Sequence, residues 1–67
     1  MIDTKLLKYC MDKADCKNED VALALNCSYH TACKKTRGAT PITTDEAQII
    51  SDMCKMDNDT RCQVFLQ

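Results

Sequence analysis

Apolar residues near the start of the chain recur with the period of an α-helix. Counted from the first, they lie at offsets of one, four, five and eight positions: Leu6, Leu7, Cys10, Met11 and Ala14. Asp3 precedes this stripe and is a suitable N-cap residue. Lys5, Lys8 and Asp12 fall mainly on the opposite side and predict a solvated face. The pattern therefore predicts a first helix over residues 4–15.

A second helical pattern follows a short polar turn. Asn18 is the expected N-cap, and the two acidic residues after it suit the positive end of a helix dipole. Apolar and small residues then continue at helical spacing from Val21 to Cys33. Gly38, the only glycine, suits the left-handed position just beyond a helix. We expect the longest helix of the chain over residues 19–37.

A third helix is predicted after the only proline. Thr43 and Glu46 have the spacing of a capping box, and the helical pattern continues to Asp57. The polar run 57–60 is expected to break the helix before a short final turn or helix at 61–66. No stretch alternates apolar and polar residues as a half-buried strand would. The chain is predicted to be one all-α domain over residues 1–67, a three-helix array with or without a short fourth helix.

The chain has six cysteines in 67 residues, which is a high density for so small a domain. A chain this short buries little apolar surface, and an even cysteine count at this density is typical of three disulfides formed in an oxidising compartment. The predicted disulfide residues are Cys10, Cys16, Cys27, Cys33, Cys54 and Cys62.

The spacing restricts the pairing of these cysteines. Two cysteines fall on or next to each predicted helix, and cysteines six positions apart on one helix, such as Cys27 and Cys33, are too far apart to bond each other. The heights of the cysteines in an up-down-up arrangement favour bridges Cys16–Cys62, Cys10–Cys33 and Cys27–Cys54. A helix break at Asp57 would move Cys62 and allow Cys54–Cys62 instead.

Charge and hydropathy exclude two classes of partner. The net charge is −1, and the chain has no basic stripe and few aromatic residues, so nucleic-acid binding is not expected. No segment is long and apolar enough to span a membrane. No signal-peptide pattern follows Met1, and we interpret the chain as a mature form whose leader is missing. Sequons at Asn26 and Asn58 fit a secretory route.

Cys27, His30 and Cys33 have a spacing that offers metal ligands. On one helix, however, they spread over about 120° of the surface, which is wider than a tetrahedral ion normally gathers. A disulfide-bonded cysteine is no nucleophile, and so short a chain leaves little room for a substrate cleft. We therefore expect no metal site, no cofactor and no enzymatic activity.

A basic cluster lies at the expected end of the second helix. Lys34, Lys35 and Arg37 form this predicted basic tip, and Tyr29 lies one to two turns earlier. One interpretation is that the cations only favour the helix C-terminus. The other is that a cationic tip on a rigid scaffold contacts an acidic receptor or a channel vestibule. On the second interpretation these four residues bind the partner.

The C-terminal third carries Ile49-Ile50, then Cys54-Lys55, five further residues and Arg61-Cys62-Gln63. This segment resembles the C-terminal helix of the molluscan attractins, which are small secreted six-cysteine helical water-borne pheromones. The resemblance implies a secreted signal whose exposed helix face around Lys55 meets a receptor.

Together these features predict a secreted, extracellular, monomeric protein that binds a protein receptor, channel or host protein as a signal, toxin or host-directed effector. A rigid stapled scaffold lowers the ordering cost of binding, which suits such a molecule. The alternative is a reduced intracellular metal-binding or redox module that uses its cysteines as thiols. The number of free thiols separates the two hypotheses.

Overall fold

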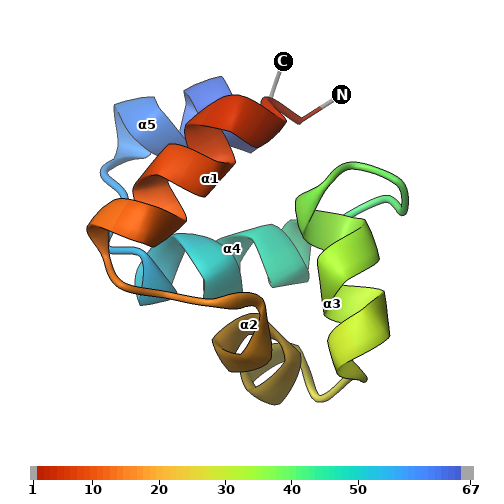
Figure 1. Cartoon of the computed structure of the whole chain (residues 1–67). Helices are drawn as coiled ribbons and strands as arrows, with labels where there is room; N and C mark the ends of the chain where they lie inside the picture. The colour runs from red at the N-terminus through yellow and green to blue at the C-terminus, as the bar shows by residue number, and fades with distance from the viewer. Residues whose placement is uncertain (1, 66–67) are drawn as a thin grey trace.

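The computed structural model describes residues 2–65, and the prediction of an all-α fold is confirmed for this part of the chain. These residues form five helices and no strand (Figure 1). The helices are α1 (Thr4–Lys13), α2 (Asn18–Leu25), α3 (Tyr29–Thr36), α4 (Thr44–Met53) and α5 (Asn58–Phe65).

The first helix forms where the apolar stripe predicts it. The Asp3 carboxylate caps it by accepting a hydrogen bond from the Leu6 backbone N–H at 3.1 Å. The stripe faces the core, because Leu7, Cys10 and Met11 are buried. The helix ends at Lys13, two residues before the predicted end.

The prediction of one long helix over residues 19–37 is wrong. The chain leaves the helix at Asn26, which adopts a left-handed conformation with φ 54°. A new helix starts two residues later, where the Ser28 hydroxyl accepts a hydrogen bond from the Thr31 N–H at 3.1 Å. Asparagine tolerates the left-handed region and serine is a good N-cap, so the two residues together make a break. Cys27 therefore lies in a turn, and the single-helix argument about Cys27 and Cys33 does not apply.

The third predicted helix begins as expected but ends early. Its capping box is confirmed, because Thr43 and Glu46 exchange backbone-to-side-chain hydrogen bonds of 3.0 and 3.2 Å. The helix ends at Met53, with Cys54 as its C-cap, and so does not reach Asp57. Asp57 caps the next helix, because its carboxylate accepts a hydrogen bond from the Thr60 N–H at 2.7 Å. The predicted final helix exists but starts at Asn58, and Leu66 lies outside the described residues.

Four of the five helices end in the same kind of turn. A residue with positive φ lies one or two positions after the last residue of each of these helices: Asp15, Asn26, Gly38 and Lys55. The next residue in the chain then donates a backbone hydrogen bond of 2.8–3.0 Å to a carbonyl five positions earlier. The left-handed role predicted for Gly38 is confirmed, and three non-glycine residues take the same role.

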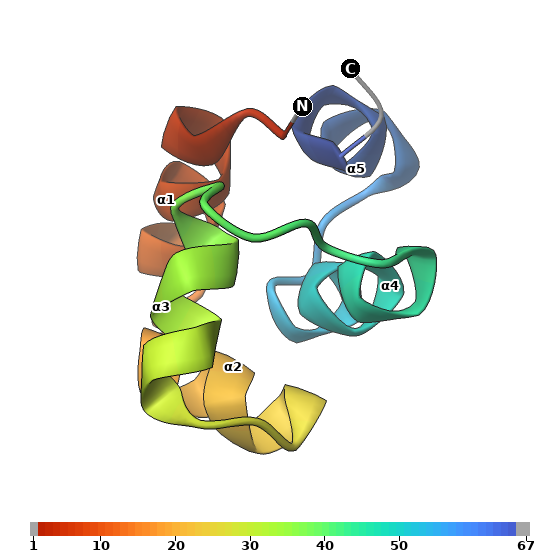
Figure 2. The ribbon, with the colours of Figure 1, turned by 90° about the vertical axis from the view of Figure 1, so that its right-hand side faces the viewer.

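The helices pack as two similar pairs with α3 added. The pairs α1–α2 and α4–α5 begin 40 positions apart, at Thr4 and Thr44, and their second helices also begin 40 positions apart. Each first helix packs on the second helix of the other pair, so that α1 lies on α5 and α2 lies on α4. Helix α3 packs on α2 and α1, and Figure 2 shows α1 and α3 on the side opposite α4 and α5.

A small apolar core lies between these pairs. Its buried residues come from all five helices and the end of α4: Leu7, Cys10, Met11, Val21, Ala22, Ala32, Ile50, Cys54 and Val64. Phe65, the only phenylalanine of the chain, packs against this core. The buried hydroxyl of Ser51 donates to the Ala47 carbonyl at 2.7 Å, so it adds no unsatisfied polar group. Two of the nine buried apolar residues in the described part of the chain are cysteines, which makes the core sensitive to thiol chemistry.

Candidate functional site

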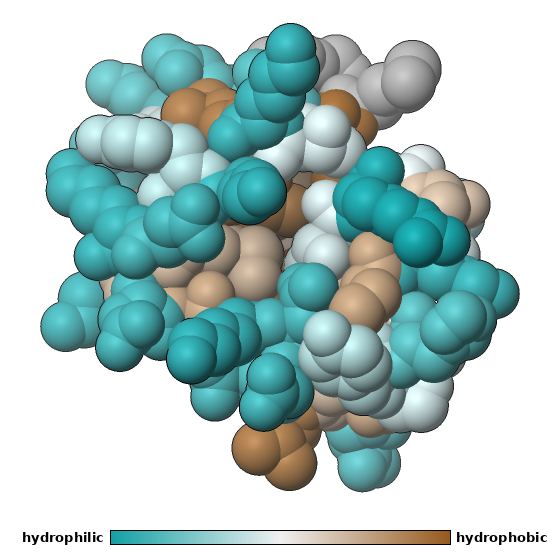
Figure 3. Space-filling model, in the orientation of Figure 1, coloured by the Kyte–Doolittle hydropathy of each residue, from teal (hydrophilic) through white to brown (hydrophobic). Residues whose placement is uncertain are grey.

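A groove of about 690 Å³ lies between α1, the start of α2 and α3, and is called here the α1–α3 groove. Its less exposed lining comes from Thr4, Met11, Cys16, Asn18, Cys33 and Thr36. Its exposed rim comes from Lys5, Lys8, Asp12, Lys17, Glu19, Tyr29 and Arg37. Figure 3 views this face and shows mainly hydrophilic side chains around a less polar recess.

Hydrogen bonds hold α3 in place along this groove. The Thr36 hydroxyl contacts both the Asn18 side-chain oxygen at 2.9 Å and the Cys33 carbonyl at 3.2 Å, so it ties the end of α3 to the start of α2. One turn earlier, a side-chain hydrogen bond to Cys33, followed by the Cys33 charge, raises the pKa of the Tyr29 hydroxyl. The ring of Tyr29 remains 55 % exposed and is available for contact at the rim.

The rim carries an excess of positive charge. Four cations, Lys5, Lys8, Lys17 and Arg37, face two carboxylates, those of Asp12 and Glu19. All six of these residues are exposed. The whole chain has a net charge of −1, so the groove is locally positive on a slightly acidic molecule.

Two of the predicted partner-binding residues lie in the α1–α3 groove. Tyr29 and Arg37 both belong to its rim. Lys34 is half-buried on α3 and is not among the residues that line the groove. The predicted basic tip is therefore divided between the groove and the rest of α3.

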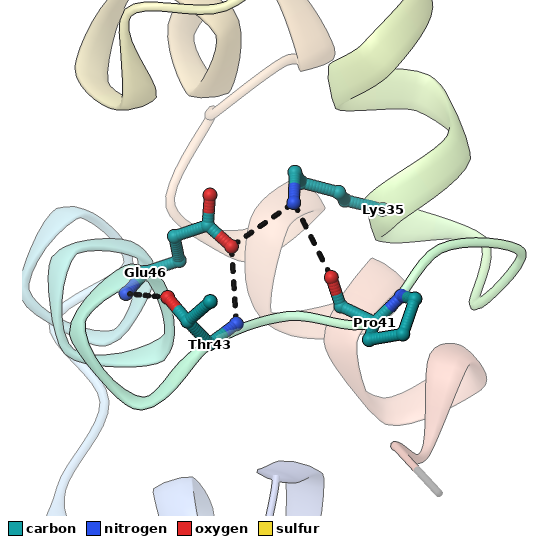
Figure 4. A network of polar contacts seen from close by, with 4 residues as sticks. All are labelled: Lys35, Pro41, Thr43 and Glu46. Carbon is teal, nitrogen blue, oxygen red and sulfur yellow. Dashed lines mark hydrogen bonds and ion pairs between the residues drawn. The ribbon is translucent and has the colours of Figure 1, made fainter.

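Lys35 lies in a different setting, shown in Figure 4. Its ammonium group lies 3.0 Å from a Glu46 carboxylate oxygen and 3.2 Å from the Pro41 carbonyl, and its side chain is 12 % exposed. The same Glu46 oxygen accepts from the Thr43 N–H at 3.0 Å. This backbone hydrogen bond first, and then the hydrogen bond and charge of Lys35, lower the pKa of Glu46. Lys35 thus joins the end of α3 to the start of α4.

Lys55 lines a second groove, of about 520 Å³, which borders α1 and the turn between α4 and α5. Tyr9 and Lys13 line the same groove, and the Lys13 ammonium lies 6.0 Å from the centre of the Tyr9 ring. Cys10 and Cys54 form part of its wall. Lys55, which the attractin resemblance implies as a contact, therefore lies in a different groove from Tyr29 and Arg37.

The structure brings no two cysteine sulfur atoms to disulfide distance, and the six side chains lie in different surroundings. Cys10 and Cys54 are buried in the core, and Cys16 lies half-buried beside Cys54. Cys27 and Cys33 are half-buried at the α2–α3 turn and in the groove, and Cys62 is exposed. Burial, with the neighbouring Cys16 thiol, raises the pKa of Cys54 to about 12. The structure thus brings together Cys16 and Cys54, a pair that the spacing argument does not favour.

Within residues 2–65, no group of three or more His, Cys, Asp or Glu side chains is placed to hold a metal ion. His30 is exposed near the start of α3, whereas Cys27 lies in the preceding turn. The candidate ligand pattern Cys27–His30–Cys33 therefore does not lie on one helix.

Three cations of the rim were missed by sequence reasoning. Lys5 and Lys8 are predicted only as a solvated face, and Lys17 only as part of a polar turn. The spacing of Lys5, Lys8 and Asp12, three and four positions apart, does place them on one helical stripe. The sequence gives no indication that α3 packs beside that stripe and turns it into one wall of a groove.

No family model matches the chain, and no significant match was found among curated proteins or solved structures. The attractin resemblance therefore stays a prediction. None of the helices in the described part of the chain has the length and apolar character needed to cross a membrane.

Proposed function

We propose that this chain is a secreted, disulfide-stapled binding protein that contacts an acidic segment of a protein partner through the α1–α3 groove. Its role would be that of a signal, a toxin or a host-directed effector. The observation that carries the proposal is the groove itself, with four exposed cations and two carboxylates on a chain of net charge −1. Such a local field attracts and orients an acidic partner.

The composition of the groove favours a peptide segment over a small metabolite. The groove is an open surface with charges spread along α1, α2 and α3. Tyr29 gives the rim an exposed aromatic side chain, and tyrosine and arginine are among the residue types enriched in strong interface contacts. An extended acidic segment along this rim would pair with several cations and pack on Tyr29.

The cysteine content supports the secreted part of the proposal. Nine buried apolar residues form a small core for 67 residues, and chains of this size usually need disulfides or another staple. Three bridges among six cysteines would supply it in an oxidising compartment. Staples would also keep the groove walls fixed and so reduce the entropy lost on binding. We propose that the chain acts as a monomer.

A second candidate is a reduced intracellular redox module. The neighbouring thiols of Cys10, Cys16 and Cys54 are the observation that favours it, because clustered thiols are the chemistry such a module needs. In that case the chain in its native setting would keep all six thiols reduced.

Titration of the ¹⁵N-labelled chain with a glutamate-rich peptide tests the binding proposal. We expect amide shift changes centred on Lys8, Tyr29 and Arg37, weakening with added salt, and none with a lysine-rich peptide of equal length. Arg37→Glu should weaken binding about tenfold. Lys55→Glu makes the same charge change at the other groove and should have little effect. Shifts spread over the whole surface, or equal losses in the two variants, would contradict the proposed site.

A further inference from the structure

One thiol pair connects parts of the fold that are 38 positions apart in the chain. Cys16 follows the left-handed turn that ends α1, and its backbone N–H bonds to the Met11 carbonyl at 2.8 Å. Cys54 ends α4, and its N–H bonds to the Ile50 carbonyl at 3.0 Å. Hydrogen bonds to the preceding helix therefore fix the backbone of both residues.

The side chain of Cys16 points to the end of α4. Its Sγ donates a weak hydrogen bond of 3.5 Å to the carbonyl of Met53, the residue before Cys54. After burial, the neighbouring Cys16 thiol is the largest cause of the raised pKa of Cys54, ahead of Cys10. Cys16 is therefore the thiol best placed to bond with Cys54.

The two thiols differ in access to solvent. Cys16 is half-buried and lines the α1–α3 groove, so a small reagent can reach its sulfur from the groove. Cys54 is only 7 % exposed and faces the core. An incoming disulfide would meet Cys16 first, and Cys54 would then react from the inside.

We propose that Cys16 and Cys54 form the first disulfide of this chain, by exchange with a small-molecule disulfide such as glutathione disulfide. The Cys16 thiolate attacks the reagent and releases one glutathione thiolate, which takes up the proton that Cys16 lost. The Cys54 thiol then loses its proton and attacks the Cys16 sulfur, releasing the second glutathione as a thiol. In total, two cysteine thiols are oxidised and one glutathione disulfide is reduced to two glutathione molecules.

The bridge would fix one wall of the groove. It would tie the α1–α2 turn to the end of α4, and so link the residues lining the α1–α3 groove to the opposite side of the fold. The inference rests on the disulfide staple of the proposed function, but its test needs no partner. A negative peptide titration would therefore contradict only the proposed binding site, and a different first bridge would contradict only the Cys16–Cys54 pairing.

Trypsin makes the test direct, because it leaves four of the six cysteines on separate peptides. Cleavage after Lys and Arg puts Cys10 on residues 9–13, Cys16 on 14–17, Cys54 on 38–55 and Cys62 on 62–67. The reduced, folded full chain is equilibrated in buffers of rising glutathione disulfide, quenched with N-ethylmaleimide, digested and analysed by mass spectrometry. We expect peptide 14–17 to be linked to peptide 38–55 at the lowest ratio of glutathione disulfide to glutathione that gives any bridge. A first link of 38–55 to 9–13, of 14–17 to another peptide, or no bridge at any ratio would overturn the proposal.

Serine variants of the full chain give a second readout. Cys16→Ser should raise the glutathione disulfide needed for the first bridge at least tenfold. The matched control Cys62→Ser removes an exposed thiol and should change that ratio less than twofold. Circular dichroism verifies that both variants keep their helices. If Cys16→Ser unfolds, Cys10→Ser provides a second test, because the Cys10→Ser variant should still form the link between peptides 14–17 and 38–55. Loss of that link in Cys10→Ser, or equal ratios for Cys16→Ser and Cys62→Ser, would refute the pairing.

Discussion

Lys55 holds a backbone conformation that its own Cβ atom disfavours. It lies between α4 and α5 with φ 55°, in the left-handed region, and its side chain is exposed. For a residue with a Cβ atom this conformation costs about 1–2 kcal/mol, while glycine loses roughly 0.5–1 kcal/mol more chain entropy on folding. Lys55→Gly should therefore raise the free energy of unfolding by about 0.5–1 kcal/mol, which corresponds to about 2–8 °C in midpoint for a domain of this size.

Two further variants isolate the backbone effect from the loss of the lysine side chain. Lys55→Ala removes nearly the same atoms but keeps Cβ, so its free energy of unfolding should stay within about 0.5 kcal/mol of the parent. Gly38→Ala makes the opposite change at φ 84°, where a Cβ atom would lie 3.1 Å from the Thr4 methyl group, and should destabilise by about 1–3 kcal/mol. Thermal unfolding followed by circular dichroism measures all three. A lower midpoint for Lys55→Gly, or an equal rise for Lys55→Ala, would refute the reasoning.

Three other predictions concern the core, acid stability and thiol reactivity. Ile50→Ala empties a fully buried position and should lower the free energy of unfolding, measured with urea, by about 2–5 kcal/mol. Ile49 is 39 % exposed, so Ile49→Ala should lower it by less than half as much. Equal losses would contradict the packing. Hydrogen bonds lower the pKa of Glu46 from 4.5, so the stability that this carboxylate contributes is present above pH 4.5 and is lost as the pH falls through the folded pKa. Glu46→Gln should remove this part of the pH dependence, which urea unfolding between pH 3 and 7 measures. The buried Cys54 thiol has a pKa of about 12, whereas Cys62 is exposed. In the reduced chain at pH 8, Cys54 should therefore react with iodoacetamide at least about tenfold more slowly than Cys62, as measured by mass spectrometry of tryptic peptides. Similar rates would contradict the burial of Cys54.

The features predicted correctly from sequence depend on short stretches of chain. The Asp3 N-cap, the Thr43–Glu46 capping box and the left-handed Gly38 each involve residues within a few positions of one another. The apolar stripe of α1 is likewise local, and its buried face follows from helical period alone. The break at Asn26 was also encoded locally, but Asn26 occurs inside a helical spacing pattern that continues on both sides. A left-handed asparagine and a helical one look alike until the serine cap two positions later is taken into account.

The features that sequence reasoning missed depend on contacts between distant residues. Lys35 pairs with Glu46 only because α3 returns to the start of α4, which turns a predicted surface cation into a structural one. The rim of the α1–α3 groove combines lysines of α1 with Arg37 after α3, and no spacing rule gives that packing. Cys16 meets Cys54 because the ends of α1 and α4 come together, whereas a three-helix arrangement places Cys16 near Cys62. Tertiary packing, which local patterns do not specify, decides all three.

The state of the six cysteines separates a secreted, stapled binding protein from a reduced intracellular module most directly. The measurement is the intact mass of the chain recovered from the organism that makes it, without reductant, before and after treatment with N-ethylmaleimide. We expect a mass six hydrogens below that of the fully reduced chain and no alkylated cysteine, as three disulfides require. A mass that gains six N-ethylmaleimide groups would contradict the stapled, secreted function and support the redox module.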